Sequence, residues 1–132
     1  MRSPEEVRQA YHLHCENLRS ALTRVANTQF EIIVDLVLRD ETELQDAFRV
    51  LFSRPMYLVG VQAPLEVLEE RERRREDRGT GMAREQYANP AFSRNYDLVI
   101  DTSTHSPEDG AIAIRSFVRD HPRHVNPRGN EI

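Results

Sequence analysis

The spacing of hydrophobic residues in the first third of the chain predicts a helix, a strand and a second helix. Between residues 4 and 26 they recur at the three- and four-residue intervals of an amphipathic helix, and Ser3 offers an N-cap. Residues 30–38, FEIIVDLVL, form a short β-branched run that is typical of a strand buried on both faces. Residues 42–52 return to a helical period.

The rest of the chain continues this alternation. Residues 56–61 (MYLVGV) and 96–103 (YDLVIDTS) have the composition of two further buried strands. Helices are expected over residues 64–78, 82–87 and 106–118. Strands that alternate with helices in this way predict an α/β fold, a three-layer arrangement in which helices cover both faces of a parallel sheet.

Composition places this fold in one domain, over residues 1–119, followed by a polar tail at 120–132 that we expect to be disordered. No apolar run approaches the roughly 20 residues of a membrane span, and the N-terminus has no signal-peptide core, so no membrane partner is expected. The single Cys15 cannot form an internal disulfide, which favours a cytoplasmic location.

Charge narrows the functional classes further. The net charge of −4 argues against a general nucleic-acid binder. All 18 basic residues are arginine, so no chemistry that requires a lysine can be carried by this sequence. His12 and His14 lie two residues apart on the first helix and point in different directions, and no metal-binding residue is predicted.

Residues 69–86, EERERRREDRGTGMAREQ, form the most unusual segment. If residues 64–78 are one helix, one arc of roughly 100° collects most of the arginines, and a separate face collects acids. The arginines are Arg71, Arg74, Arg75 and Arg78, and the acids are Glu69, Glu72 and Glu76.

This segment has two interpretations. It can be a solvated helix that neutralises itself through pairs such as Glu69–Arg73 and Glu70–Arg74. It can also be a row of guanidinium groups that meets phosphate oxygens, with flexible backbone at Gly79–Thr80–Gly81 and Arg84 one turn further on. Periodicity alone leaves both open.

Three stretches in a fixed order resemble the chloramphenicol phosphotransferase-like family of small P-loop kinases. They are IIVDLVL (32–38), YLVGVQAPLEVLEERERRREDRGTGMAREQ (57–86) and YDLVIDTSTHSPEDGAIAI (96–114), and the resemblance spans about residues 1–119. It implies a P-loop kinase type of fold and ATP-dependent phosphoryl transfer, with Mg²⁺, to a hydroxyl of a small molecule. The implied partners are therefore a nucleotide and a small-molecule substrate.

The resemblance also implies roles for individual residues. Arg71, Arg75 and Arg78 fall on the family's lid arginines, which are expected to meet the ATP phosphates. Asp35 falls at the carboxyl end of a strand that lines the cleft, where an acid can hold a Mg²⁺-bound water or position the acceptor. The loop at 101–107 matches the segment that packs on the adenine. The residues expected to bind the nucleotide are Arg84, Thr102, Ser103, Thr104 and Pro107.

Three positions depart from the family's pattern. Glu76 stands where glycine is usual, Leu36 follows Asp35 where a second acid is often found, and Pro90–Ala91 replaces a Val-His pair. The last change removes a polar group from the site, so chloramphenicol cannot be assumed to be the acceptor.

A further departure concerns the P-loop itself. The sequence contains no G-x-x-x-x-G-K-[ST] motif, so we expect the fold to lack its first strand and the chain to have little kinase activity. One explanation is a truncated gene product or a truncated gene model. The other is a short protein that has lost catalysis and acts as a binding module. Because the P-loop strand would lie between residues 32–37 and 56–61, its absence leaves a sheet edge through which the chain could form a homo-oligomer.

Overall fold

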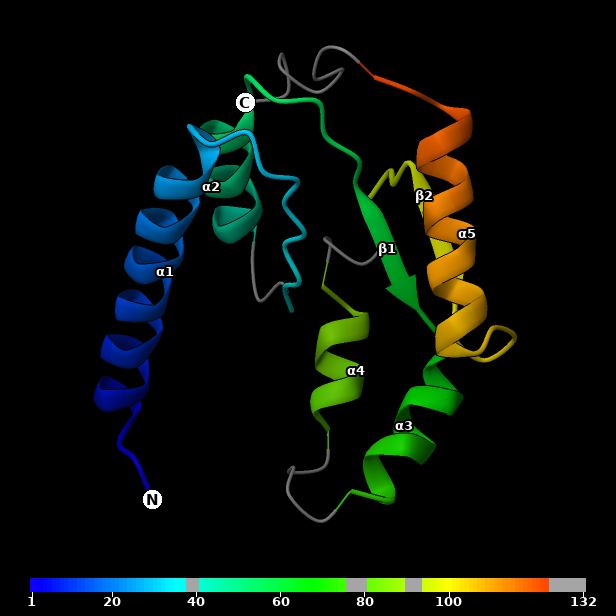
Figure 1. Cartoon of the computed structure of the whole chain (residues 1–132). Coiled ribbons are helices and arrows are strands. Elements are labelled where there is room, and N and C mark those ends of the chain that lie inside the picture. The colour runs from blue at the N-terminus through cyan, green and yellow to red at the C-terminus, as the bar shows by residue number, and fades with distance from the viewer. Residues whose placement is uncertain (38–40, 76–80, 90–93, 124–132) are drawn as a thin grey trace. The chain divides into compact units, whose positions relative to one another are not determined.

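The computed structural model describes residues 1–37, 41–75, 81–89 and 94–123 (Figure 1). Within these residues the chain forms five helices and two strands. It divides into two compact units, with the boundary between Met56 and Tyr57. None of the described helices has both the length and the apolar character that a membrane crossing requires.

The first unit begins with α1 (Pro4–Ala26), the helix that the sequence predicts. A capping box fixes its start, because the Ser3 hydroxyl accepts the Glu6 amide at 3.2 Å and the Glu6 carboxylate accepts the Ser3 amide at 2.7 Å. These bonds satisfy amide groups that have no partner within the helix, so the prediction of an N-cap at Ser3 is confirmed.

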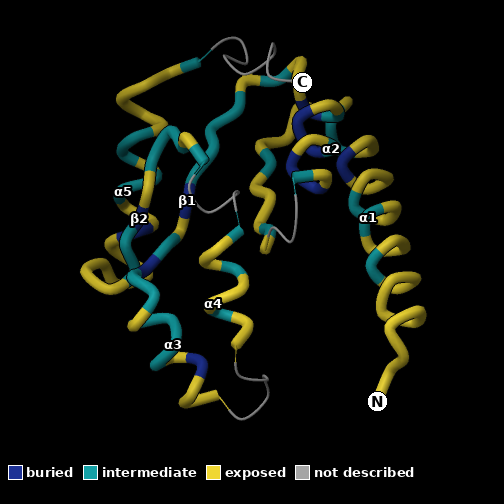
Figure 2. The backbone as a smooth tube through the Cα atoms, turned by 180° about the vertical axis from the view of Figure 1, so that it is seen from behind, coloured by how far each residue is buried: buried dark blue, intermediate teal, exposed yellow. Residues whose placement is uncertain are grey.

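A small hydrophobic core joins α1 to α2 (Glu41–Leu51). Leu22 of α1 packs with Ala47 and Leu51 of α2, and an ion pair of 2.7 Å joins Arg19 to Asp46 beside them. Most of α1 before this contact is exposed (Figure 2). The predicted apolar face of α1 is therefore buried only in its second half.

The strand predicted at 30–38 is wrong for the described residues. Residues up to Val37 contain no strand, and the side chain of Ile33 is 96% exposed. A strand that is buried on both faces needs strand neighbours, and no described segment pairs with this one.

Arg54 orders the turn that precedes this segment. Its guanidinium donates to the carbonyl oxygens of Val25 at 3.2 Å and Thr28 at 2.8 Å, and also to the carbonyl of Phe30. These bonds add a donor to carbonyl groups in the last turn of α1 and just beyond it, and they place positive charge where the helix dipole favours it. The turn after α1 is thus held by Arg54, a residue that follows α2 in the chain.

The second unit contains a parallel sheet of β1 (Val59–Gln62) and β2 (Leu98–Asp101). Val59 lies opposite Leu98, and Gln62 lies opposite Asp101. The strands predicted at 56–61 and 96–103 are confirmed, although each is shorter than expected. Gly60 allows the Tyr96 ring to lie against β1, because a Cβ atom there would be 2.9 Å from the ring.

Within its described residues, the second unit also contains three helices, two before β2 in the chain and one after it. The connection between the strands contains α3 (Leu65–Arg73) and α4 (Met82–Tyr87). After β2, α5 (Pro107–Asp120) begins at an N-cap formed by Ser106 and packs against β2 (Figure 1). The molecule is a mixed α/β protein with a small open parallel sheet, which is compatible with a P-loop kinase-like fold.

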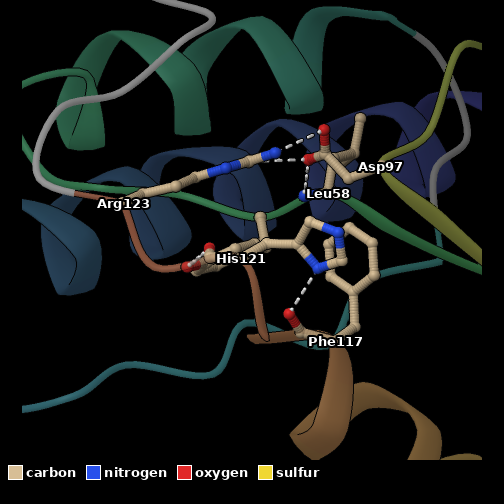
Figure 3. Close-up of polar contacts among 6 residues, drawn as sticks. Leu58, Asp97, Phe117, His121 and Arg123 are labelled. Atoms are coloured by element: carbon tan, nitrogen blue, oxygen red, sulfur yellow. Dashed lines mark hydrogen bonds and ion pairs between the residues drawn. The ribbon is translucent and has the colours of Figure 1, made fainter. Parts of the chain in front are cut away.

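The amino-terminal end of the sheet is closed by an ion pair. Asp97 accepts two bonds from the Arg123 guanidinium, at 3.0 and 3.1 Å, and also accepts the Leu58 amide at 2.7 Å (Figure 3). The hydrogen bond that Arg123 donates to Asp97 is the main cause that raises the pKa of Arg123 above its ordinary value. One carboxylate thus joins both strands to the end of the described chain.

Aromatic rings make further contacts near this ion pair and at the carboxyl end of α5. The Arg123 guanidinium lies 4.4 Å from the centre of the Tyr57 ring, and the His121 ring stacks on Phe117 with centroids 4.2 Å apart. Figure 3 shows the His121 Nδ1 directed at the Phe117 carbonyl, at 2.9 Å. The domain boundary after residue 119 stays a prediction, and residues 124–132 lie outside the described range.

Candidate functional site

The loop that follows β2 is a folded turn at the carboxyl end of the sheet. Asp101 accepts the Ser103 amide at 2.8 Å and the Ser103 hydroxyl at 2.5 Å. Across the strands, the Thr102 amide donates to the Gln62 carbonyl at 2.8 Å. Ligands of open α/β sheets bind beside the carboxyl ends of the strands, so this loop occupies the position where a site is expected.

Electrostatics favour the ionised form of the carboxylate in this turn. The bond from the Ser103 hydroxyl is the largest cause that lowers the pKa of Asp101, followed by the bond from the Ser103 amide. The nearby charges of His105 and Arg71 act in the same direction. The Asp101 carboxylate therefore stabilises the turn in its ionised form, and its negative charge lies near Arg71 of α3.

Arg71 connects α3 to this loop. Its guanidinium donates to the Thr102 hydroxyl at 2.7 Å and to the Thr102 carbonyl at 2.9 Å. The two partners are 31 residues apart in the sequence, and the Arg71 side chain remains exposed. The fold thus brings a predicted phosphate-binding arginine onto a predicted nucleotide-binding threonine.

The remaining predicted nucleotide contacts lie close to Thr102 in the chain. Ser103 and Thr104 are exposed, and the Thr104 hydroxyl is 3.0 Å from His105 Nδ1. Pro107 is the first residue of α5 and is also exposed. Ser103 and Thr104 thus present hydroxyl groups to the surface at the same end of the sheet.

The helix that carries the arginines is shorter than predicted. It ends at Arg73 rather than at residue 78, and Arg75 lies exposed beyond its end. Arg78 lies outside the described residues. The prediction that four arginines share one helical arc is therefore wrong for the helix as it forms.

Local ion pairs account for part of the arginine run. Glu70 pairs with Arg73 at 2.6 Å and with Arg74 at 3.0 Å. The hydrogen bond from Arg73 is the main cause that lowers the pKa of Glu70. The predicted Glu70–Arg74 pair is thus confirmed, whereas Arg73 pairs with Glu70 rather than with Glu69. Arg71 instead contacts the loop after β2, and its role toward phosphate stays a prediction.

The acidic face of α3 is turned toward α4. The Glu72 carboxylate is buried and accepts the Gly81 amide at 3.1 Å and the Ala83 amide at 3.0 Å. Glu69 pairs with Arg84 at 2.9 Å, which places this predicted nucleotide contact against α3. No glycine or proline occurs between Pro64 and Gly79, so the end of α3 at Arg73 is not set by a helix-breaking residue.

Asp35 was expected at the carboxyl end of a strand that the described residues do not form. It lies in the first unit, is exposed, and belongs to the segment that forms no strand in the described range. The Mg²⁺ and acceptor roles of Asp35 therefore stay predictions. The described residues contain no group of three or more His, Cys, Asp or Glu side chains that could hold a metal ion.

Comparison with known protein families gives one match. The model of the chloramphenicol phosphotransferase-like protein family matches residues 3–119. The chain belongs to this family. Comparisons with curated proteins and with solved structures gave no match. Family membership supports a kinase-like phosphotransferase fold, and it is consistent with the contact between Arg71 and the loop after β2.

The contacts of three charged residues were not predicted from the sequence: Glu69, Glu72 and Arg123. The acids at Glu69 and Glu72 were expected on one face, and their spacing was the available signal for a helix packed against that face. Arg123 gave no comparable signal, because it lies in a polar, proline-rich segment typical of a tail. Its role depends on Asp97, which is 26 residues away.

Proposed function

We propose that this protein is a kinase-like phosphotransferase module that recognises the phosphates of ATP, with the hydroxyl of a small molecule as the acceptor. The observation that carries the proposal is the pair of hydrogen bonds between Arg71 and Thr102. They put a guanidinium group at the carboxyl end of a parallel sheet, beside the loop that the family resemblance assigns to the nucleotide.

The residues of this region fit a polyphosphate in part. Arg71 and Arg75 are exposed and positively charged, and arginine forks match phosphate oxygens. Their task would be to neutralise charge on the transferring group. The loop from Thr102 to Thr104 would face the base. Arg78 and Asp35 are proposed as the third lid arginine and as the group that serves the Mg²⁺ or the acceptor.

The sequence itself limits the expected strength of binding. It has neither a G-x-x-x-x-G-K-[ST] motif nor a lysine to place on the phosphates. Removing one such set of preorganised donors typically costs several kcal/mol of transition-state stabilisation. We therefore propose that the 132-residue chain binds Mg-ATP weakly and has little activity. A cytoplasmic location and the absence of a nucleic-acid partner belong to the same proposal.

Calorimetry with Mg-ATP tests this proposal. The expected dissociation constant is roughly millimolar, as follows from the absent phosphate cradle. Arg71→Ala should weaken binding about tenfold, because a charge-assisted bond to phosphate contributes roughly 1.5 kcal/mol. Arg73→Ala is the matched control, since Arg73 is on the same helix but pairs with Glu70, and it should change the affinity little.

Two results would contradict the proposal. A micromolar dissociation constant would show that the missing motif is not needed for binding. Equal losses from Arg71→Ala and Arg73→Ala would show that charge alone, rather than the placement of Arg71, attracts the nucleotide.

A second candidate function is a non-catalytic module that self-associates. Within the described residues β1 has one strand neighbour, β2, and an open strand edge can pair with another chain. Sedimentation of the purified chain separates the candidates. A stable dimer without measurable Mg-ATP binding would favour self-association, and a monomer that binds Mg-ATP would exclude it as the main function.

A further inference from the structure

A buried carboxylate joins the two helices of the arginine segment. Glu72 is only 8% exposed although it lies in a run of charged residues. One of its oxygens accepts the Gly81 amide and the other accepts the Ala83 amide, at 3.1 and 3.0 Å. These amides lie at the start of α4, so a single side chain holds the chain on both sides of residues 76–80.

The energetics of this contact make it specific. A buried carboxylate is destabilising unless hydrogen bonds replace its lost water, and bonds from amides to an ionised oxygen are among the stronger ones in proteins. The helix α4 has only six residues, too few to be stable alone in water. Its position therefore depends on Glu72 and on the neighbouring pair between Glu69 and Arg84.

We infer that Glu72 is a positioning residue for phosphate binding: its carboxylate fixes α4, with Arg84, against the helix that carries Arg71. This role rests on the proposed function, because it concerns the same arginines. Arg71 is already directed at the loop after β2, and Arg84 is held on α4 beside the same helix. Arginines that are ordered before the anion arrives lose less conformational freedom when they bind it.

Simple electrostatics predicts the opposite effect of a substitution at Glu72. Removing a negative charge from an arginine-rich segment should strengthen its attraction for an anion. If Glu72 acts by position, neutralising it should instead weaken binding, because α4 loses its attachment. The sign of the change therefore distinguishes a positioning role from a general effect of charge.

The test compares Glu72→Gln with Glu70→Gln in the complete chain. Both changes remove one negative charge from α3 and keep the size of the side chain, but Glu70 pairs only with arginines of its own segment. Each variant is titrated with Mg-ATP while the NMR signals of the arginine Nε–H groups are recorded. The shifts of these signals give the dissociation constant. We expect Glu72→Gln to weaken binding roughly threefold to tenfold, and Glu70→Gln to leave it unchanged or strengthen it.

Amide hydrogen exchange supplies a second readout that does not depend on the nucleotide. In the wild-type chain the Gly81 and Ala83 amides should be protected. Glu72→Gln should speed their exchange, and Glu70→Gln should not. If Glu72→Gln fails to fold, protection of these two amides in the wild type still tests the contact, and exchange at the rate of free peptide would overturn the inference.

The remaining outcomes separate this inference from the proposed function. Wild-type-like or tighter binding by a folded Glu72→Gln variant would overturn the inference while leaving the proposed function intact. Arginine signals that do not move when Mg-ATP is added to the wild type would overturn the proposed function, and with it the role of Glu72 in binding.

Discussion

The two ends of β2 carry aspartates in opposite situations. Asp97, just before the strand, has a side chain only 12% exposed and is held by Arg123 and by the Leu58 amide. Asp101, the last residue of the strand, binds the hydroxyl and amide of Ser103 in an exposed turn. The same residue type therefore closes the sheet at one end and shapes a surface loop at the other.

This difference places a largely buried charge pair and a set of exposed polar groups at opposite ends of one strand. At the amino end of β2, the Asp97 and Arg123 charges are paired within the structure, and the Tyr57 ring lies 4.4 Å from the Arg123 guanidinium. At the carboxyl end, Arg71 reaches the loop while remaining exposed to solvent, where a ligand could meet it. The arrangement agrees with the general preference of α/β folds for ligands at the carboxyl ends of strands.

The largest expected effect is at the closed end. Asp97→Ala should lower the free energy of unfolding of the second unit by about 2 to 3 kcal/mol, because it leaves the Arg123 charge and the Leu58 amide without this partner. Chemical denaturation followed by NMR signals from β1 and β2 measures the change. Asp101→Ala is the matched control and should alter stability far less, since its bonds lie in an exposed turn. If both substitutions lowered the free energy of unfolding equally, the two ends of β2 would not differ in their contribution to stability.

A smaller effect is expected from packing near the same end. Gly60→Ala would place a methyl group about 2.9 Å from the Tyr96 ring, so the ring or the strand must shift. We expect a loss of about 1 to 2 kcal/mol in the free energy of unfolding, typical of overpacking. Val61→Ala, at an exposed position of the same strand, should cost less and serves as the control. A Gly60→Ala variant as stable as the wild type would show that the ring moves freely.

The smallest effect concerns the pKa of Asp101 at the open end. Its folded-state pKa lies below the ordinary value of 3.8, so its stabilising contribution is present above that value and is lost as pH falls through the folded-state pKa. The Ser103 amide signal in NMR should titrate below pH 3.8. Ser103→Ala should raise the pKa more than Arg71→Ala does, because the Ser103 bonds are the larger cause. A Ser103 signal that titrates above the ordinary value would contradict the turn described here.

Much of the secondary structure could be predicted from the sequence. The capping residues Ser3 and Ser106 set helix starts through contacts three residues away, which are visible in any local pattern. The strands around Gly60 and Val99 could also be predicted, because short β-branched runs between helices favour a parallel sheet. Their predicted burial on both faces was wrong, since Val61 and Val99 are exposed. The role of the arginine segment was only partly accessible, since periodicity could not tell which arginines remain on the helix.

The tertiary structure decided the rest, for a common physical reason. The segment around Ile33 has the composition of a strand, but strand formation needs a hydrogen-bonded neighbour, and no described segment supplies one. Glu72 binds amides 9 and 11 residues away, and Arg123 binds Asp97, which is 26 residues away. The sequence by itself determined which segments can be helices or strands and which charges are available. The three-dimensional fold determined which of those charges meet, because their partners are distant in the chain.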